Sequence, residues 1–254
     1  MSRFCFSLRE IGESIDAELV VVMPIYNEAA NIAPVISAWS ATLRQSGVSF
    51  QIVALDDGSR DETHRILLEL ETQNPELICV VSKPNAGHGS TCRIGYDIAI
   101  NSAAKWVLQI DSDGQCDPKY FVEFWAKREH ADCVFGMRTS RDDGVPRILT
   151  SAICRLGSSL ICGRDLKDAN VPYRLMRRET VRRALEHIPP NFNIHNVALT
   201  YVLKKMPDVR WEYVAIHFPD RTAGENSINL LKVMTWGAEM LLELLRIRVG
   251  SDKA

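Results

Sequence analysis

The chain has 254 residues, 46% of them hydrophobic and 24% charged, and its formal net charge is −2 at pH 7. This length suits one large α/β domain with a substantial core, and the charge gives no support for nucleic-acid binding by bulk electrostatics. No uncharged apolar stretch of about 18 residues occurs, so we expect no transmembrane helix. Residues 1–15 lack the basic start and apolar centre of a secretory signal.

The seven cysteines include no CxxC pair, and several of them lie in apolar runs. An odd count in this pattern is typical of reduced thiols rather than of a disulfide framework or a zinc site. We therefore expect a cytoplasmic protein.

In the first half of the chain, apolar segments predict strands at residues 19–24, 50–55, 78–81, 106–110 and 133–136. Helical spacing of apolar residues predicts intervening helices at residues 29–43, 60–72, 91–102 and 118–130. Ser59 and Glu62 have the spacing of a capping box, which places a helix start at residue 60. This alternation of strand and helix predicts a mostly parallel sheet with helices on both faces.

The second half of the chain is less regular. Its pattern predicts helices at residues 147–162, 179–187 and 197–206, and strands at residues 171–176 and 209–218. No convincing linker interrupts it, so we expect a single domain over residues 1–225. Residues 226–254 would then form an apolar, amphipathic C-terminal helix.

Polar clusters follow three of the predicted strands, at residues 26–28, 56–57 and 111–113. In parallel sheets, ligands bind at the carboxyl ends of the strands. The three clusters are therefore expected to share one site.

Asp111 and Asp113 are the most informative of these polar residues. Residues two apart in an extended segment point to the same side, so both carboxylates can converge on one cation. Mg²⁺ and Mn²⁺ prefer oxygen ligands, commonly share them with substrate phosphates, and neutralise a leaving diphosphate. The alternative is a turn before a helix capped near Asp117. The second acidic pair, Asp56 and Asp57, favours the metal, because such clustered charge needs compensation.

Four segments occur in a characteristic order: residues 21–28 (VVMPIYNE), 56–63 (DDGSRDET), 85–89 (NAGHG) and 109–115 (QIDSDGQ). Together they resemble family 2 glycosyltransferases, and within these the polyprenyl-phosphate sugar synthases. The resemblance implies a GT-A fold, which is a Rossmann-like, mostly parallel sheet flanked by helices. It also implies a nucleotide-binding half at residues 17–137 and an acceptor half at residues 138–225.

The resemblance implies roles for individual residues. Three would line the pocket for the nucleotide base and ribose: Pro24, Tyr26 and Glu28. Asp57 would hydrogen-bond the base, with Asp56 close by. The alternatives are a surface aromatic for Tyr26 and a turn residue for Asp57.

The same resemblance implies that Asp111 and Asp113 bind Mg²⁺ or Mn²⁺ together with the nucleotide diphosphate. Gln115 would lie near the metal or the donor sugar. Gly87 would let the backbone approach a ligand. His88 has no evident base partner in the sequence, so we interpret it as a loop hydrogen-bonding residue rather than a catalyst.

Four residues match the places where lipid-phosphate synthases hold the acceptor phosphate: Arg138, Arg147, Ser151 and Arg221. The alternative is a solvated loop with salt bridges. A phosphate monoester, with its second pKa of about 6, is largely anionic at pH 7 and needs no base. A hydroxyl acceptor needs one, and Asp168 could supply it or instead orient Arg174 or Arg177.

The leading hypothesis is an inverting transfer of a hexose from a UDP- or GDP-sugar to a polyprenyl phosphate at the cytoplasmic membrane face. The close rival is transfer to a hydroxyl in polysaccharide or glycolipid assembly. A rival of another class is a non-catalytic nucleotide-sugar binding module. The helix over residues 226–254 would lie in the membrane interface, pack on the core or form a dimer contact. The sequence leaves the base, the sugar, the acceptor and the oligomeric state open.

Overall fold

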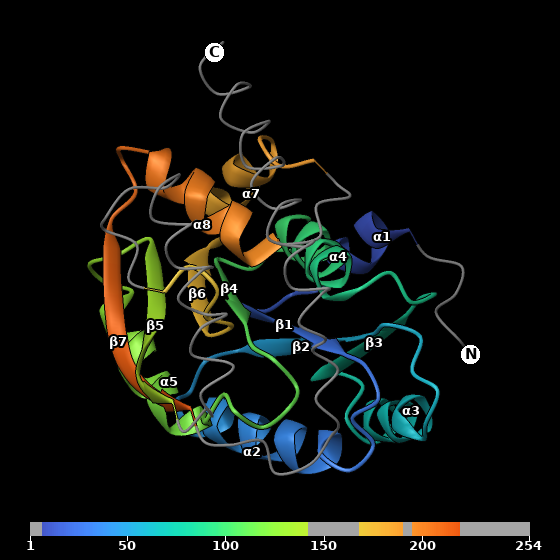
Figure 1. The fold of residues 1–254 in the computed structure, drawn as a ribbon. Helices are drawn as coiled ribbons and strands as arrows, with labels where there is room; N and C mark the ends of the chain where they lie inside the picture. The colour runs from blue at the N-terminus through green and yellow to red at the C-terminus, as the bar shows by residue number, and fades with distance from the viewer. Residues whose placement is uncertain (1–6, 142–167, 190–194, 219–254) are drawn as a thin grey trace, which may run out of the picture.

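The computed structural model describes residues 7–141, 168–189 and 195–218. In these residues the central element is a seven-stranded sheet in the order β3-β2-β1-β4-β6-β5-β7 (Figure 1). The strands are β1 (Leu19–Ile25), β2 (Phe50–Asp56), β3 (Ile78–Ser82), β4 (Trp106–Gln109), β5 (Cys133–Arg141), β6 (Arg174–Arg177) and β7 (Trp211–Phe218). Only β6 runs antiparallel to its neighbours among these strands, so the sheet is mostly parallel, as expected.

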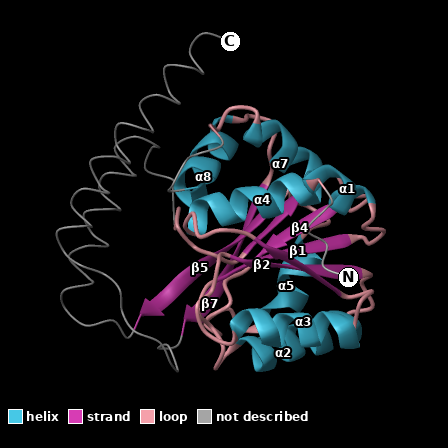
Figure 2. Ribbon diagram, turned by 90° about the vertical axis from the view of Figure 1, so that its right-hand side faces the viewer, coloured by secondary structure: helices cyan, strands magenta, loops and turns pink. Residues whose placement is uncertain are grey.

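Helices cover both faces of this sheet (Figure 2). One face carries α2 (Ile32–Gln45), α3 (Thr63–Gln73) and α5 (Phe121–Lys127), which follows the short 3-10 helix η1 (Pro118–Tyr120). The other carries α1 (Leu8–Glu13), α4 (His88–Ile100), α7 (Arg178–Leu185) and α8 (His195–Lys205). The predicted α/β architecture is confirmed.

The core lies between the sheet and these helices, and every residue of β1 is buried. Helix α4 packs unusually close to the sheet at Gly95. A Cβ atom there would lie only 2.7 Å from Cδ1 of Leu55 and would also clash with Val22. This close packing fixes α4, and its first turn therefore lies beside the carboxyl ends of the central strands.

Helix α3 begins differently from the prediction. It starts at Thr63, and its N-cap residue Glu62 makes no side-chain capping bond, so the predicted capping box is wrong. The Asp61 carboxylate instead accepts from the Thr63 amide at 3.0 Å. Ser59 Oγ accepts from the Asn27 amide at 3.0 Å, which joins the turn after β2 to the turn after β1.

Two predicted helices, at residues 147–162 and 226–254, lie outside the described residues. Within the described part of the chain, no helix is both long and apolar enough to cross a membrane. Helix α1 is an addition to the predicted elements. Its capping box is formed by Ser7 and Glu10.

Candidate active site

The three polar clusters meet at the carboxyl edge of the sheet, which is formed by the carboxyl ends of its parallel strands. They meet there because β1 lies between β2 and β4. The register aligns Ile25 at the end of β1 with Asp56 at the end of β2, and Val22 with Gln109 at the end of β4. Residues 26–28, 56–57 and 111–113 therefore leave the sheet side by side. The predicted convergence of these clusters is confirmed.

Ser112, between the two metal-site candidates, ties their segment to β1. Its side chain is buried, and its hydroxyl donates to the Pro24 carbonyl at 2.9 Å. Pro24, which was expected to line the nucleotide pocket, is buried within β1, and its carbonyl is the acceptor in this contact. The segment that carries Asp111 and Asp113 is thereby attached to the central strand rather than held in a free loop.

Asp111 and Asp113 differ in exposure and in partners. The side chain of Asp111 is 28% exposed, and its Oδ1 lies 3.0 Å from Nε2 of His88. Asp113 is only 5% exposed, and its Oδ1 accepts from the Gln115 amide at 3.1 Å. Gly114 makes this turn with φ of +81°, a conformation that side chains disfavour. Gln115 thus orients Asp113 through its backbone.

This donor set fits a divalent cation that is shared with a substrate. The residues that the structure describes contain no cluster of three or more His, Cys, Asp or Glu that could hold a metal by itself. Two carboxylates from the chain leave most of the coordination shell to phosphate oxygens and water. Mg²⁺ and Mn²⁺ are commonly bound in this way.

Cys116 lies next to these carboxylates and is buried. Burial, together with the negative charges of Asp111 and Asp113, raises the pKa of its thiol well above the usual value. The side chain is therefore a neutral thiol at pH 7 and not a nucleophile.

Asp56 is 2% exposed and holds the turn that follows β2. Its Oδ1 accepts from the Ser59 amide at 3.0 Å, and its Oδ2 accepts from the Ser82 hydroxyl at 2.8 Å. Nδ1 of His64 lies 3.1 Å from the same Oδ2. Asp56 thus joins the end of β2 to the end of β3.

Asp57 is 4% exposed and is bound by the segment that leads from β3 into α4. Its Oδ1 pairs with the Lys83 ammonium and accepts from the Ala86 amide at 2.8 Å, while its Oδ2 accepts from the Gly87 amide at 2.9 Å. Three donors occupy most of the roughly four acceptor positions of a carboxylate. The chain itself therefore compensates the charge of Asp57.

The sequence prediction missed the role of residues 83–88. Gly87, with φ of +87°, is the N-cap residue of α4, and His88 is the first residue of that helix. The Gly87 amide holds Asp57 while the His88 imidazole holds Asp111. His88 is thus a hydrogen-bonding residue, as expected, but its partner is a metal-site candidate. The position of His88 between two glycines at the start of a helix was the sequence signal that could have indicated this role.

The segment after β1 presents one aromatic ring to solvent. Tyr26 is 41% exposed, and Asn27 follows with φ of +53°, in the left-handed region. The Glu28 amide donates to Thr63 Oγ1 at 2.8 Å, and the Glu28 carboxylate accepts from Nδ2 of Asn31 at 2.8 Å. Tyr26 and Glu28 therefore lie at the rim of the carboxyl edge, on a well-anchored turn.

Arg138 of β5 forms a two-pronged ion pair with Asp168. Its Nε and Nη2 donate to the two carboxylate oxygens at 2.5 and 2.6 Å. The side chains are 14% and 15% exposed. Both were predicted site residues, and the structure brings them together. Arg147, Ser151 and Arg221 lie outside the described residues.

Asp168 pairs with Arg138 rather than with the two arginines considered from the sequence. Arg174 is fully buried and donates to the carbonyls of Val171, Ala169 and Asn196 at 2.5, 2.7 and 2.8 Å. Arg177 pairs with Asp132 at 2.8 Å. Both arginines therefore serve the packing of β6.

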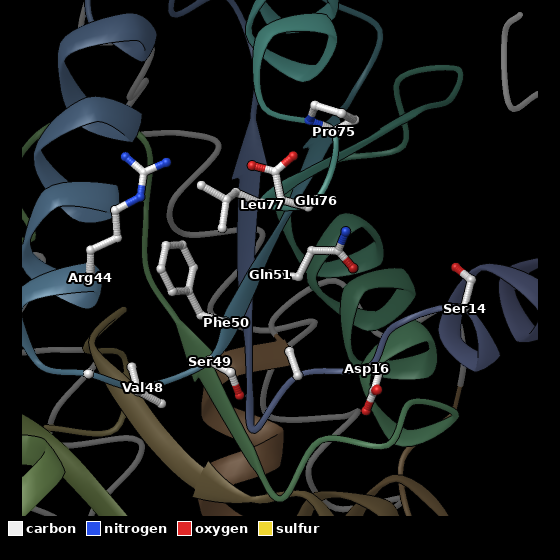
Figure 3. A pocket seen from close by; sticks show the side chains of 12 residues that line it. Ser14, Asp16, Arg44, Val48, Ser49, Phe50, Gln51, Pro75, Glu76 and Leu77 are labelled. Atoms are coloured by element: carbon white, nitrogen blue, oxygen red, sulfur yellow. The ribbon is translucent and has the colours of Figure 1, made fainter.

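A surface hollow of about 740 Å³ lies at the opposite edge of the sheet (Figure 3). Phe50 and Gln51, which begin β2, line it together with Leu77, just before β3. The candidate site is at the other end of the same strands, so this hollow is separate from it.

Solved structures with the same fold include glucosyl-3-phosphoglycerate synthase from Mycobacterium tuberculosis. It is 20% identical, with a TM-score of 0.62 over 98% of this chain and 86% of that chain. Mannosyl-3-phosphoglycerate synthase from Rubrobacter xylanophilus is 15% identical, with a TM-score of 0.60 over 96% and 78%. These similarities confirm the GT-A fold.

Curated relatives include undecaprenyl-phosphate 4-deoxy-4-formamido-L-arabinose transferases. The protein from Pectobacterium carotovorum is 26% identical over 226 residues, which cover 87% of this chain and 65% of the relative. The protein from Pseudomonas fluorescens is 28% identical over 163 residues, covering 63% and 47%. The chain thus spans between about half and two thirds of the length of these relatives.

The family model described as glycosyl transferase family 2 matches residues 20–186. This range contains the four sequence segments and the carboxyl edge with both acidic pairs. The chain therefore belongs to glycosyl transferase family 2.

Proposed function

We propose that the protein is a metal-dependent glycosyltransferase that moves a hexose from a UDP- or GDP-sugar to a polyprenyl phosphate. The observation that carries this proposal is the pair Asp111 and Asp113, attached to β1 through Ser112 at the carboxyl edge. Family membership and curated relatives named undecaprenyl-phosphate sugar transferases support it. A protein of the same fold was solved with Mn²⁺ and UDP, which makes Mn²⁺ the first cation to test.

Asp111 and Asp113 would hold Mg²⁺ or Mn²⁺, which would neutralise the charge of the departing nucleoside diphosphate. The exposed Tyr26 ring would pack against the base or ribose, next to Glu28. Asp57 has most of its acceptor positions occupied, so its main contribution is to keep residues 83–88 in place beside the donor. Gln115 would act by fixing Asp113.

The acceptor phosphate would attack the anomeric carbon on the face opposite the leaving diphosphate, inverting the centre. It needs no general base, because a phosphate monoester with a second pKa of about 6 is already anionic. Arg138 would exchange its two hydrogen bonds to Asp168 for two to the phosphate, since an arginine fork suits both groups. Arg147, Ser151 and Arg221 belong to the same proposal. The helix expected over residues 226–254 would bring the protein to the cytoplasmic membrane face.

The rival, transfer to a hydroxyl, requires a base with an oxygen directed at that hydroxyl. Asp168 was the candidate from the sequence. Both of its oxygens accept from Arg138, and this weighs against a base in the free protein. The intact pair Asp111 and Asp113 favours an enzyme over a non-catalytic binding module, and a turnover measurement separates the two.

The test is a transfer assay with labelled UDP- and GDP-sugars in Mn²⁺, Mg²⁺ or EDTA. Undecaprenyl phosphate and undecaprenol, which share the same chain and differ only in the phosphate, serve as paired acceptors. We expect a lipid-linked sugar only with the phosphate and only with a cation. Product on undecaprenol alone would support the rival. Metal-dependent nucleotide-sugar binding by calorimetry without turnover on either acceptor would support the binding module.

A further inference from the structure

Gln109 is a polar side chain at the end of an apolar strand. It is the last residue of β4, follows Trp106, Val107 and Leu108, and is 0% exposed. Burying an amide away from water is costly unless its donors and acceptors find partners. The partners of Gln109 therefore indicate what the residue does.

Two hydrogen bonds connect Gln109 to the candidate site and to α4. Its Oε1 accepts from the Tyr96 hydroxyl at 3.3 Å, and its Nε2 donates to Oδ1 of Asp111 at 3.4 Å. Burial raises the pKa of Tyr96 well above its usual value, so the phenol stays protonated and acts as the donor. A donating phenol faces the amide oxygen, and this directs the amide N–H group toward Asp111.

The layer beneath Asp111 is firmly packed. Tyr96 is 0% exposed, and its ring lies against His195 with centroids 5.2 Å apart. Arg174, the register partner of Gln109 on β6, is also 0% exposed. Neither neighbour of Gln109 can move without disturbing the core. Both hydrogen bonds of Gln109 are long, so they orient the side chains that they join and contribute little to folding stability.

We propose that Gln109 is a positioning residue for the metal site, and this rests on the proposed function. Together with His88, which contacts the same oxygen, it would fix Oδ1 of Asp111 for the role of this carboxylate as a cation ligand. Tyr96 acts through Gln109 by fixing the orientation of the amide. Groups that orient a metal ligand in this way typically affect metal affinity by about 10- to 100-fold.

The test variant is Gln109→Met, which keeps the length and apolar volume of the side chain and removes both hydrogen bonds. Mn²⁺ binding is measured by electron paramagnetic resonance in the presence of UDP. Because the contacts are long, we expect an affinity about 10-fold weaker, at the low end of the usual range. UDP binding in EDTA stays unchanged. In the transfer assay the Mn²⁺ concentration for half-maximal rate rises, while the rate at saturating Mn²⁺ changes little.

Two further variants make the test specific. Tyr96→Phe keeps the ring and removes only the hydroxyl, so it weakens Mn²⁺ binding less than Gln109→Met does. The double variant binds Mn²⁺ no more weakly than Gln109→Met alone, because Tyr96 acts through Gln109. Gln51→Met, the same replacement at the start of β2, leaves Mn²⁺ binding unchanged.

Unchanged Mn²⁺ affinity in folded Gln109→Met protein overturns the inference. If that variant does not fold, unchanged affinity in Tyr96→Phe overturns it equally. Failure of the wild-type protein to bind Mn²⁺ with UDP would instead remove the proposed function, on which the inference rests. The wild-type measurement therefore separates the two failures.

Discussion

Asp132 connects strands β5, β6 and β7, and its replacement should lower the stability of the fold by an amount that follows from its pKa. The residue precedes β5, and its Oδ1 accepts from Arg177 at 2.8 Å and from Arg210 at 3.0 Å. Its Oδ2 accepts from the Arg210 amide at 3.1 Å and from the Arg210 Nε at 3.0 Å. The carboxylate is 14% exposed. We therefore expect Asp132→Asn to destabilise the fold.

The magnitude follows from the pKa of this carboxyl. Hydrogen bonds from Arg210, only partly opposed by burial, lower its pKa from 3.8 to about 2. Because a tenfold change in a protonation equilibrium corresponds to about 1.4 kcal/mol, the charged form stabilises the fold by about 2 kcal/mol at pH 7. The lowered pKa means that this stabilisation is full above pH 3.8 and is lost as the pH falls through about 2. About half of it should remain at pH 3.

The assay is urea unfolding of wild-type and Asp132→Asn protein at pH 7, 5 and 3. We expect a difference in unfolding free energy of about 2 kcal/mol at pH 7 and 5, and about 1 kcal/mol at pH 3. The matched control is Asp208→Asn, which removes an exposed partner of Arg183 and should change stability far less, because solvent screens exposed ion pairs. A difference at pH 7 no larger than that of the control, or one that grows as the pH falls, would refute the reasoning.

Three further changes test the site. Ser112→Ala should lower stability by about 1 kcal/mol in urea unfolding and reduce kcat in the transfer assay, because the acidic segment loses its bond to β1. Lys83→Met leaves the Asp57 carboxylate with only backbone donors and should lower the free energy of unfolding by about 2 kcal/mol. It should also weaken UDP binding measured by calorimetry, and unchanged UDP affinity would contradict the role given to residues 83–88. Arg138→Met should raise the KM for undecaprenyl phosphate and leave the KM for the donor unaltered; equal effects on both would place Asp168 and its partner in a purely structural role.

The fold was largely predictable because the strands of this protein are short apolar runs and the helices have clear periodicity. β1, β2 and β3 match their predicted ranges to within one residue. Their carboxyl ends had to meet at one edge, since parallel strands share a direction. The convergence of residues 26–28, 56–57 and 111–113 was therefore foreseeable from the sequence.

The side-chain partners were not foreseeable in the same way. The capping-box spacing of Ser59 and Glu62 was present, yet Ser59 bonds to Asn27, a contact across 32 positions of the chain. The pair Arg138 and Asp168 spans 30 positions and depends on how β5 approaches the segment before β6. Local patterns specify elements, whereas these contacts depend on the packed arrangement of distant ones.

The contact between His88 and Asp111 was not predicted, because it also joins segments that are distant in the sequence. The sequence shows a histidine between two glycines, which suits a flexible loop as well as a helix start. The close packing of α4 at Gly95 against β1 and β2 places that first turn beside the carboxyl ends of the strands, where His88 contacts Asp111. A site residue that acts through a neighbour's carboxylate leaves little trace in a single sequence.

The most direct measurement of the central claim is the rate of sugar transfer by Asp111→Asn and Asp113→Asn proteins, with Asp208→Asn as the matched control. If the two carboxylates hold the cation that stabilises the leaving diphosphate, each variant should lose at least about 100-fold in rate at fixed Mn²⁺. The control should keep the wild-type rate, and EDTA should stop both the control and the wild-type enzyme. Transfer at the wild-type rate by either site variant, or undiminished transfer by the wild-type protein in EDTA, would contradict the claim.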